Sequence, residues 1–555
     1  MPRSLVCSGA CNLNEEMKNI KKFFSILWLL PAFLMWASFP PMGEKTDILF
    51  ALAPLMWLTR RGAAKANFKI WFLNGFLFWV LTLSWMPAIV KNGGPLPLVI
   101  LGWGVLSAYC ALFFGAYGYF AQCAWSWAKE GSYARRLLMI FLVEPILWCG
   151  LELVRSRFMG GFSWNQLGVP IANMGFGAPA AIGGVYMVSA IVIMINGLIA
   201  GQIERFWKVE ESNFKGLRKF GAIETIIPVA IIYALYVWAD SELVFKPGVE
   251  KEELKVAMVQ RNFPCVFNAD SSKDNPRTVY EDLLKYPAYL KPDLVILPES
   301  ALCEFGEIHT ARAKNFASGI LSKTGAKGVI AGGLSVMGAK EYNSAALYAA
   351  DGSLQVYDKV HLVPFGEFIP GDKIFPVLQR FAPVGSCTPG EKKLLSLACR
   401  DIDLGVAICF EDTDSALIRS LTEMGAQALV FITNDSWFSG SVETEQHAWQ
   451  ALVRAIETAR PIVRVGNSGV TGTIDEHGRA SWIVGLDGKV LVDARTSASD
   501  KISFLSAAEA KKHLTIYVRY GDKPLMILFA CLLSVMCAIR ISKNWGIAKH
   551  GEFLV

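Results

Sequence analysis

Long apolar runs constrain this chain more than any other feature of its sequence. Runs of about 20 apolar residues, the length that crosses a bilayer, are predicted near 23–41, 48–59, 70–90, 97–124, 137–154, 179–203, 222–239 and 524–541. The second run is short and contains Pro54. Hydrophobic residues make up 53% of the 555 residues and charged residues only 18%. This composition predicts a polytopic membrane protein, and the small net charge of +6 indicates no nucleic-acid surface.

Lysine and arginine are unevenly shared between the two sides of the predicted membrane. Eighteen fall in connections on one side, and the other short connections hold four: Lys45, Lys91, Arg155 and Arg157. Because cytoplasmic loops carry this excess, both termini are predicted to be cytoplasmic, with the long polar block on the outer face. Loss of the short second span would reverse this prediction. The predicted division is a cytoplasmic segment 1–22, a seven-helix membrane domain 23–240, an outer domain 241–522, a last membrane helix 523–541 and a cytoplasmic tail 542–555.

The polar block has the pattern of an α/β domain. Short aliphatic runs predict strands at 254–260, 293–297, 328–332, 344–349, 404–408, 428–433 and 462–465, with helical patterns at 315–323, 416–423 and 444–458. Glu299 and Cys409 directly follow two of these strands. Ligands of open α/β sheets bind at the carboxyl ends of the strands. Both residues are therefore candidate site residues.

Cys409, Glu299 and Lys359 together could carry out acyl transfer through a thioester. Asp412, Thr413 and Asp414 are N-cap candidates for a helix after Cys409, and a helix N-terminus would lower the pKa of the thiol. The alternative is a buried, inert cysteine. Glu299 is a candidate general base, and Lys359 a candidate for stabilising an oxyanion.

Other titratable residues have structural interpretations beside functional ones. His361 could serve as the base of a Cys-His pair, but it is interpreted as structural because Glu299 fills that role. The 12 cysteines and six histidines show no zinc-binding pattern, so no metal site is expected. Glu144 and Glu152 lie in the fifth predicted span, where ionisable residues are functional candidates. For Glu152, simple pairing with Arg155 one turn later is an equal alternative.

The order Glu299, Lys359, Cys409 resembles the Glu-Lys-Cys triad of the nitrilase superfamily. Four longer stretches resemble the apolipoprotein N-acyltransferase family: Lys-Val-His-Leu-Val-Pro-Phe-Gly-Glu at 359–367, Thr-Asn-Asp-Ser-Trp-Phe at 433–438, Arg-Pro-Ile-Val-Arg-Val-Gly-Asn-Ser-Gly-Val-Thr at 460–471 and Tyr-Val-Arg-Tyr-Gly-Asp at 517–522. The resemblance implies eight membrane helices joined to a nitrilase-like αββα sandwich that faces the periplasm from the bacterial inner membrane.

The same resemblance implies a reaction and roles for its residues. A phospholipid would donate a fatty acyl chain to the α-amino group of the diacylglyceryl-cysteine of an apolipoprotein, with no cofactor. Cys409 would be the nucleophile, Glu299 the proton acceptor and Lys359 the oxyanion stabiliser. Supporting roles would fall to Glu367, Glu411 and Asn343.

The chain departs from the family pattern at four positions. Ser163 stands where the family usually has proline, and Phe410 where tyrosine commonly follows the nucleophile. Arg261 and Ala269 replace a usual glycine and tryptophan. These departures concern acyl-chain or lipoprotein contacts and leave the three candidate catalytic residues unchanged.

Two other functions are alternatives to acyl transfer. A membrane-anchored amidase or nitrilase would use the same three residues on small amides, but it would not require eight spans. A transporter with an outer binding domain would require ionisable residues on several spans, whereas Glu144 and Glu152 are the chief examples.

Overall fold

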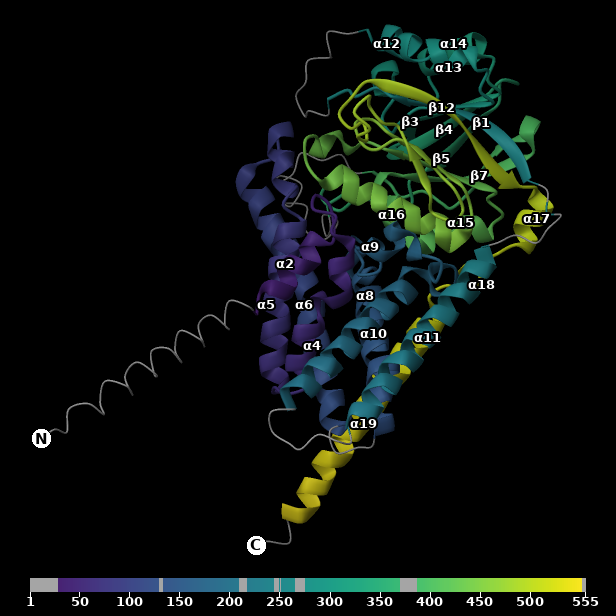
Figure 1. The fold of residues 1–555 in the computed structure, drawn as a ribbon. Helices are drawn as coiled ribbons and strands as arrows, with labels where there is room; N and C mark the ends of the chain where they lie inside the picture. The colour runs from purple at the N-terminus through teal and green to yellow at the C-terminus, as the bar shows by residue number, and fades with distance from the viewer. Residues whose placement is uncertain are drawn as a thin grey trace, which may run out of the picture.

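The computed structural model describes residues 28–128, 133–208, 217–243, 249, 251–264, 275–369 and 387–551. It shows a bundle of helices beneath a domain built on two sheets (Figure 1). The predicted segment 1–22 and the departure at Ala269 lie outside the described residues.

The helical part contains both long and short helices. They are α2 (Leu30–Ala37), α3 (Ile48–Ala51), α4 (Ala53–Thr59), α5 (Ala64–Thr82), α6 (Leu96–Ala128), α7 (Tyr133–Leu138), α8 (Glu144–Arg155), α9 (Val169–Ile171), α10 (Ala180–Lys208), α11 (Leu217–Leu243) and the C-terminal α19 (Lys523–Gly551).

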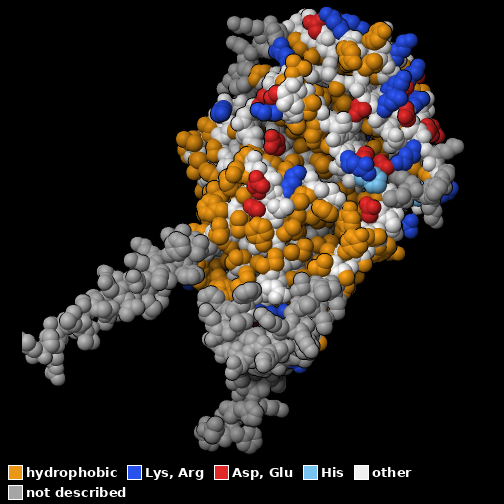
Figure 2. All heavy atoms as spheres, viewed as in Figure 1, with side chains coloured by type: hydrophobic (Ala, Val, Ile, Leu, Met, Phe, Trp, Pro, Cys, Tyr) orange, Lys and Arg blue, Asp and Glu red, His pale blue; other side chains and the backbone are white. Residues whose placement is uncertain are grey.

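Several of these helices can cross a membrane. Among the described residues, five stretches are long and apolar enough: Ala64–Asn92, Leu96–Ala128, Ala134–Arg155, Ala180–Arg205 and Lys523–Arg540. They coincide with five of the predicted spans, and the remaining predictions fall on α2, on α3 with α4, and on α11. Apolar side chains dominate this half of the visible surface, whereas charged side chains gather over the sheets (Figure 2). The protein is therefore a membrane protein.

The short second predicted span folds as two successive helices, α3 and α4. A side chain from α10 forms hydrogen bonds with backbone groups at the break between them. Leu52 separates α3 from α4, and Pro54 stands in the first turn of α4. Asn196 of α10 accepts a hydrogen bond from Leu52 N (2.8 Å) and donates one to Ile48 O (2.9 Å). A side chain inserted between the two groups of a helical hydrogen bond produces such a kink.

In its described residues, the sheet domain contains twelve strands. They are β1 (Lys251–Gln260), β2 (Leu294–Ile296), β3 (Gly328–Met337), β4 (Lys340–Ala349), β5 (Leu354–Asp358), β6 (Leu395–Leu397), β7 (Ile402–Ile408), β8 (Ala428–Thr433), β9 (Ile462–Gly466), β10 (Gly472–Ile474), β11 (Ala480–Trp482) and β12 (Thr496–Leu505). They form two six-stranded sheets, ordered β12-β1-β2-β3-β4-β5 and β11-β10-β9-β8-β7-β6. All seven predicted strands are confirmed.

Helices cover the outer face of each sheet. On the first sheet they are α12 (Pro276–Leu283), α13 (Lys285–Tyr289) and α14 (Ala311–Thr324), and on the second α15 (Ser415–Glu423) and α16 (Glu443–Thr458). The short α17 (Ala507–Lys512) and α18 (Ile516–Tyr520) lead back to α19. This is the αββα layering that the family resemblance implies.

Alternation along the buried strands explains the layering. In β8, Val430 and Ile432 point into the core between the sheets, whereas Leu429 and Phe431 pack beneath α15 and α16. Both faces of a strand that lies between two apolar layers must be apolar. A continuous apolar run therefore folds as a central strand here.

Helix α16 joins the sheet domain to the helical part (Figure 1). The Gln446 side chain accepts hydrogen bonds from the indoles of Trp85 (3.2 Å) and Trp164 (2.9 Å). It also donates to the carbonyl oxygens of Pro40 (3.0 Å) and Thr82 (3.3 Å). One buried amide thus binds several segments of the helical part.

Candidate active site

Three strand ends bring the predicted site residues together. Glu299 follows β2, Lys359 directly follows β5, and Cys409 directly follows β7. Lys359 Nζ lies 3.9 Å from Glu299 Oε1, and the charges of both residues act on the Cys409 thiol. Gly332 is needed for this approach, because a Cβ there would lie 2.5 Å from Glu299 Cα.

Cys409 occupies a tight turn with a positive φ of 53°. Non-glycine residues in this conformation are uncommon and are held in place by the surrounding structure. The turn that follows, Cys409–Thr413, is a 3₁₀ turn, and helix α15 starts only at Ser415 with Asp414 as its N-cap. The N-cap prediction for Asp414 is therefore confirmed.

The predicted lowering of the Cys409 pKa is wrong. Burial raises the pKa of this thiol well above its usual value, and the Glu299 carboxylate raises it further, although Lys359 opposes both effects. No α-helix begins at Cys409, so a helix dipole does not offset its burial. The thiol therefore needs a base to become a nucleophile.

Lys359 is nearly fully buried and faces two carboxylates. Its Nζ donates to Glu367 Oε1 at 2.9 Å. Asn343 Nδ2 donates to Glu299 Oε1 (2.7 Å) and to Glu367 Oε1 (2.6 Å). We call Glu299, Asn343, Lys359 and Glu367 the lysine group.

The two carboxyls of the lysine group differ in proton affinity. Burial raises the pKa of Glu299, and the attraction of Lys359 only partly offsets this. For Glu367, the positive charge of Lys359 and hydrogen bonds from Val363 N, Asn343 and Lys359 outweigh burial, so the pKa is lowered. Burial alone would lower the Lys359 pKa, but the nearby negative charges raise it. Glu299 is thus the carboxyl of the group that takes up a proton more readily.

Glu411 joins the nucleophile turn to the lysine segment. Its carboxylate accepts hydrogen bonds from Ile408 N (2.8 Å), Val360 N (2.7 Å) and His361 N (3.0 Å). The Tyr357 hydroxyl adds another at 3.1 Å. Burial raises the Glu411 pKa to about 7 despite these donors. Glu411 therefore fixes the turn that carries Cys409 against the segment that follows Lys359.

His361 lies at the rim of the site. Its ring nitrogens contact Asp414 Oδ2 (3.0 Å) and Gly160 O (2.8 Å). Both nitrogens are therefore occupied by partners other than the thiol, in keeping with its structural interpretation.

A second set of buried charged residues was missed by the sequence analysis. His447 lies between Asp412 Oδ1 (2.8 Å) and Asp435 Oδ1 (3.0 Å), and Arg464 Nη2 lies 3.3 Å from Asp435 Oδ2. Glu443 is 3.5 Å from His447. We call Asp412, Asp435, Glu443, His447 and Arg464 the histidine group. Asp435 lies in the 433–438 motif and His447 in the predicted helix 444–458. The sequence gives no indication that these two residues are in contact.

The histidine group also bears on metal binding. Within the described residues, Asp435, Glu443 and His447 are close enough to share an ion. However, carboxylate oxygens occupy both imidazole nitrogens, and the Arg464 cation contacts Asp435. A metal ligand must offer a free nitrogen lone pair, so this arrangement fits a protonated imidazole better than a metal ligand.

Comparison with known proteins follows this division into two parts. A model for the apolipoprotein N-acyltransferase N-terminal domain matches residues 31–198, and a carbon-nitrogen hydrolase model matches residues 255–509. Proteins named apolipoprotein N-acyltransferase are similar along nearly their whole length. The one from Geobacter metallireducens is 28% identical over 91% of this chain and 93% of its own. The chain belongs to the apolipoprotein N-acyltransferase family.

One further relative agrees with this assignment. The apolipoprotein N-acyltransferase of Shewanella oneidensis is 27% identical over 93% of this chain and 96% of its own. Among solved structures, a CN-hydrolase superfamily protein from Xanthomonas campestris aligns with a TM-score of 0.35 and 18% identity, covering 50% of this chain and 97% of that one.

The departures from the usual apolipoprotein N-acyltransferase pattern have visible contacts. Phe410 stacks on Phe162 (6.1 Å between ring centroids) and Trp164 (6.3 Å) of the helical part. Ser163 Oγ forms a hydrogen bond with Thr413 Oγ1 (2.9 Å) in the nucleophile turn. Arg261 is buried and forms an ion pair with Glu304.

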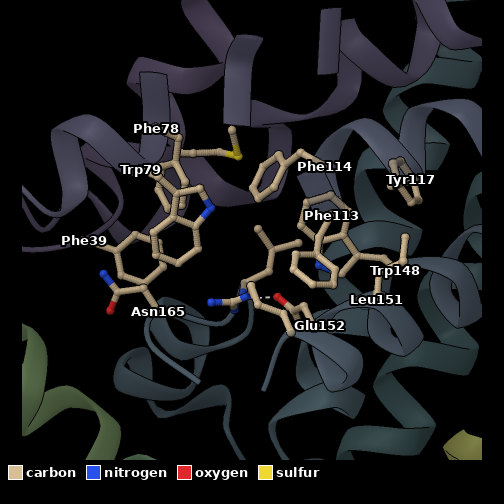
Figure 3. Close-up of a pocket in the computed structure, with 13 residues that line it drawn as sticks. Phe39, Phe78, Trp79, Phe113, Phe114, Tyr117, Trp148, Leu151, Glu152 and Asn165 are labelled. Carbon is tan, nitrogen blue, oxygen red and sulfur yellow. Dashed lines mark hydrogen bonds between the residues drawn. The ribbon is translucent and has the colours of Figure 1, made fainter. Parts of the chain in front are cut away.

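A small, mostly apolar pocket lies in the helical part (Figure 3), and Trp79 of its lining packs against Phe162 of the aromatic stack (5.8 Å between ring centroids). Phe78, Trp79 and Phe114 line the pocket, with Glu152 and Arg155 at one side. Glu152 Oε1 accepts a hydrogen bond from Leu167 N at 2.8 Å. Arg155 instead donates to the carbonyls of Phe162 and Trp164, each at 2.9 Å.

Glu144 is buried at the opposite end of α8. It accepts a hydrogen bond from Trp125 Nε1 at 2.7 Å and lies 3.6 Å from Arg60 Nη2. Its charge therefore has a partner within the helical part.

Proposed function

We propose that this protein transfers a fatty acyl chain from a membrane phospholipid to the N-terminal α-amino group of a diacylglyceryl-cysteine apolipoprotein, through a thioester on Cys409. One observation carries the proposal: Glu299, Lys359 and Cys409 converge from three strand ends at one edge of the sheet domain. The family assignment and the membrane-spanning helices indicate the kind of substrate.

Acylation of the enzyme begins with proton transfer. Glu299 takes the thiol proton of Cys409, and the thiolate attacks the ester carbonyl of the phospholipid. The Lys359 ammonium and the Phe410 backbone N–H stabilise the oxyanion of the tetrahedral intermediate. The intermediate collapses to the thioester, and the leaving lysophospholipid oxygen takes the proton from Glu299.

Transfer to the acceptor repeats these steps with an amine. The neutral amine attacks the thioester, Glu299 takes a proton from the nitrogen, and the proton returns to the departing sulfur of Cys409. The products are an amide and the free thiol. A thioester must be shielded from water during the exchange of lipids, and the aromatic stack of Phe162, Trp164 and Phe410 supports this role.

The supporting residues keep these groups in place. Glu367 and Asn343 would hold Lys359 and Glu299, and Glu411 would hold the turn that carries Cys409. No step calls for a metal or an organic cofactor.

The proposal includes an orientation. The chain would lie in the bacterial inner membrane with both termini on the cytoplasmic side. The sheet domain would then lie in the periplasm. The lysine and arginine bias of the loops supports this topology.

The test is to incubate the purified protein with radiolabelled phospholipid and isolate any covalent adduct. We expect a hydroxylamine-sensitive acyl-enzyme in the wild type and none in Cys409→Ala. Cys399→Ala is a matched control, because Cys399 is exposed and lies outside the site. An adduct that persists in Cys409→Ala would refute Cys409 as the nucleophile, and hydrolysis of small amides without an acyl-enzyme would favour the amidase alternative.

A further inference from the structure

His447 is enclosed by charges from four different elements. Asp412 belongs to the nucleophile turn, Asp435 to the turn after β8, Glu443 to the first turn of α16, and Arg464 to β9. His447 is only 1% exposed, so water does not screen these contacts.

The hydrogen bonds around His447 require two ring protons. A neutral imidazole has one donor and one acceptor nitrogen. Here both nitrogens face carboxylate oxygens, of Asp412 at 2.8 Å and of Asp435 at 3.0 Å. An acceptor nitrogen facing a carboxylate would be repelled, so the geometry selects the doubly protonated ring.

The pKa shifts agree with this geometry. Burial alone would lower the His447 pKa, but Asp412 and Asp435 outweigh it and raise the pKa to about 10, against a lesser opposing effect of Arg464. Burial and the nearby Asp435 raise the Glu443 pKa well above its usual value. Around His447, two cations, His447 itself and Arg464, thus face the two aspartates.

The histidine group connects back to the nucleophile. Thr433 Oγ1 donates to Asp435 Oδ1 at 2.5 Å, and the Thr433 side chain is also among the groups that act on the Cys409 thiol. Asp412 lies in the same turn as Cys409. A ring of contacts therefore runs from Cys409 through Thr433, Asp435, His447 and Asp412 back to the Cys409 turn.

The backbone leaves this ring little freedom. A Cβ at Gly469 would lie 1.9 Å from Asp435 Oδ2. Asp435 is thus packed from one side by Gly469 and bound from the other by His447, Thr433 and Arg464.

We propose that His447 is a positioning residue for the nucleophile, a doubly protonated imidazole that joins Asp412 to Asp435 and through Thr433 fixes the Cys409 sulfur. The proposal rests on the function given above, because it assumes that Cys409 is the reacting group. In this proposal the histidine group holds the nucleophile turn in place and balances the buried charges around it. The group does not contact the substrate.

The first test is His447→Gln, which removes the cation and one of the two donors. The rate of Cys409 alkylation by iodoacetamide is followed by peptide mass spectrometry between pH 6 and pH 10. Loss of a nearby positive charge destabilises the thiolate, so the reactivity profile should move to higher pH by about one unit, an approximately tenfold loss at a fixed pH. The KM for phospholipid should stay unchanged. His513→Gln, which alters a histidine 3.2 Å from Glu509, is the matched control and should behave as wild type.

The second test addresses the link through Thr433. Thr433→Val removes the hydroxyl with little change in shape and should slow Cys409 alkylation, whereas Thr433→Ser keeps the hydroxyl and should restore it. Wild-type alkylation in both Thr433→Val and His447→Gln would overturn the proposal.

Two further measurements separate the alternatives. A stoichiometric metal in the wild type that is lost in His447→Gln would overturn the proposal in favour of a metal site. If His447→Gln does not fold, ¹⁵N-histidine spectra at pH 8 decide. Both ring nitrogens of His361 also face oxygen acceptors, so the spectra are recorded in His361→Gln; a ring with two N–H groups there supports the proposal, and its absence overturns the proposal. If the wild type forms no acyl-enzyme while Cys409 alkylation still depends on His447, the proposed function fails and the positioning role stands.

Discussion

The lysine group and the histidine group both flank Cys409, yet their charges balance differently. In the lysine group a single cation, Lys359, faces two carboxyls, and one of these, Glu299, has a raised pKa. In the histidine group two cations face two aspartates, and Glu443 has a strongly raised pKa. The first group is one proton short of neutrality and can gain and return a proton. The second has as many cations as aspartates, which suits it to holding atoms in place.

The largest effect expected is that of Glu299→Gln, which removes the proton acceptor from the unbalanced group. Acyl-enzyme formation should fall by about 10²–10⁴-fold, the usual contribution of a general base. In the wild type the rate should be lost as the pH falls through the Glu299 pKa, which lies above its ordinary value of 4.5. Single-turnover acylation measured against pH tests both statements.

Glu391→Gln is the control for this substitution, because Glu391 is exposed outside the site. If Glu299→Gln acylated at the wild-type rate, the lysine group would not be the proton-transfer side, and the contrast with the histidine group would fail.

Lys359→Met should give the next largest effect. Loss of one oxyanion donor should slow acylation by about 10²–10³-fold. It should also lower the free energy of unfolding by about 3–5 kcal/mol, because the carboxylates of Glu299 and Glu367 would lose their buried cation. His447→Gln should cost less stability, since Arg464 remains beside Asp435. Equal losses of thermal stability in the two variants would remove this distinction.

Glu411→Gln should have a moderate effect that is chiefly structural. The amide would turn an N–H₂ toward backbone donors that now meet a carboxylate oxygen, at a cost of about 1–3 kcal/mol. Because the Glu411 pKa is raised to about 7 from 4.5, its contribution to stability is full below pH 4.5 and is lost as the pH rises through 7. Thermal unfolding followed across this range should lose that slope in the variant, and an unchanged slope would contradict the assignment.

Ser163→Ala should give the smallest effect. The hydroxyl binds Thr413 at 2.9 Å, so its loss should cost about 0.5–1.5 kcal/mol and leave acylation nearly unchanged. Thermal unfolding and single-turnover rates provide the measurement. A loss comparable with that of Lys359→Met would mean that the helical part, and not the histidine group, positions the nucleophile turn.

Most of the fold could be predicted because its central strands are apolar on both faces. Leu429–Ile432 is recognisable without knowledge of its neighbours, and Glu299 and Cys409 follow such strands directly. Strand β12 (Thr496–Leu505) was missed because it begins with polar residues such as Asp500 and Lys501. This strand lies at the edge of its sheet, next to β1. The first half of β12 is only partly buried, so its side chains need not be apolar.

The histidine group could not be predicted, since its members come from four elements that meet only in the folded chain. Taken singly, Asp412 resembles an N-cap, and His447 resembles an ordinary helical residue. The pKa direction of Cys409 was wrong for a related reason. A strand followed by a helix looks the same in sequence whether the helix begins at the cysteine or six residues later at Ser415.

Gln446 bears on whether the two parts of this enzyme are modular. Its amide is the shared partner of two tryptophan indoles and two backbone carbonyls that all belong to the helical part. An excised sheet domain would leave this amide and the first turn of α16 without their anchors, next to the residues that steady Cys409. A water-soluble truncation would therefore be an unfaithful stand-in for inhibitor screening, and the intact chain in a lipid environment is the proper target.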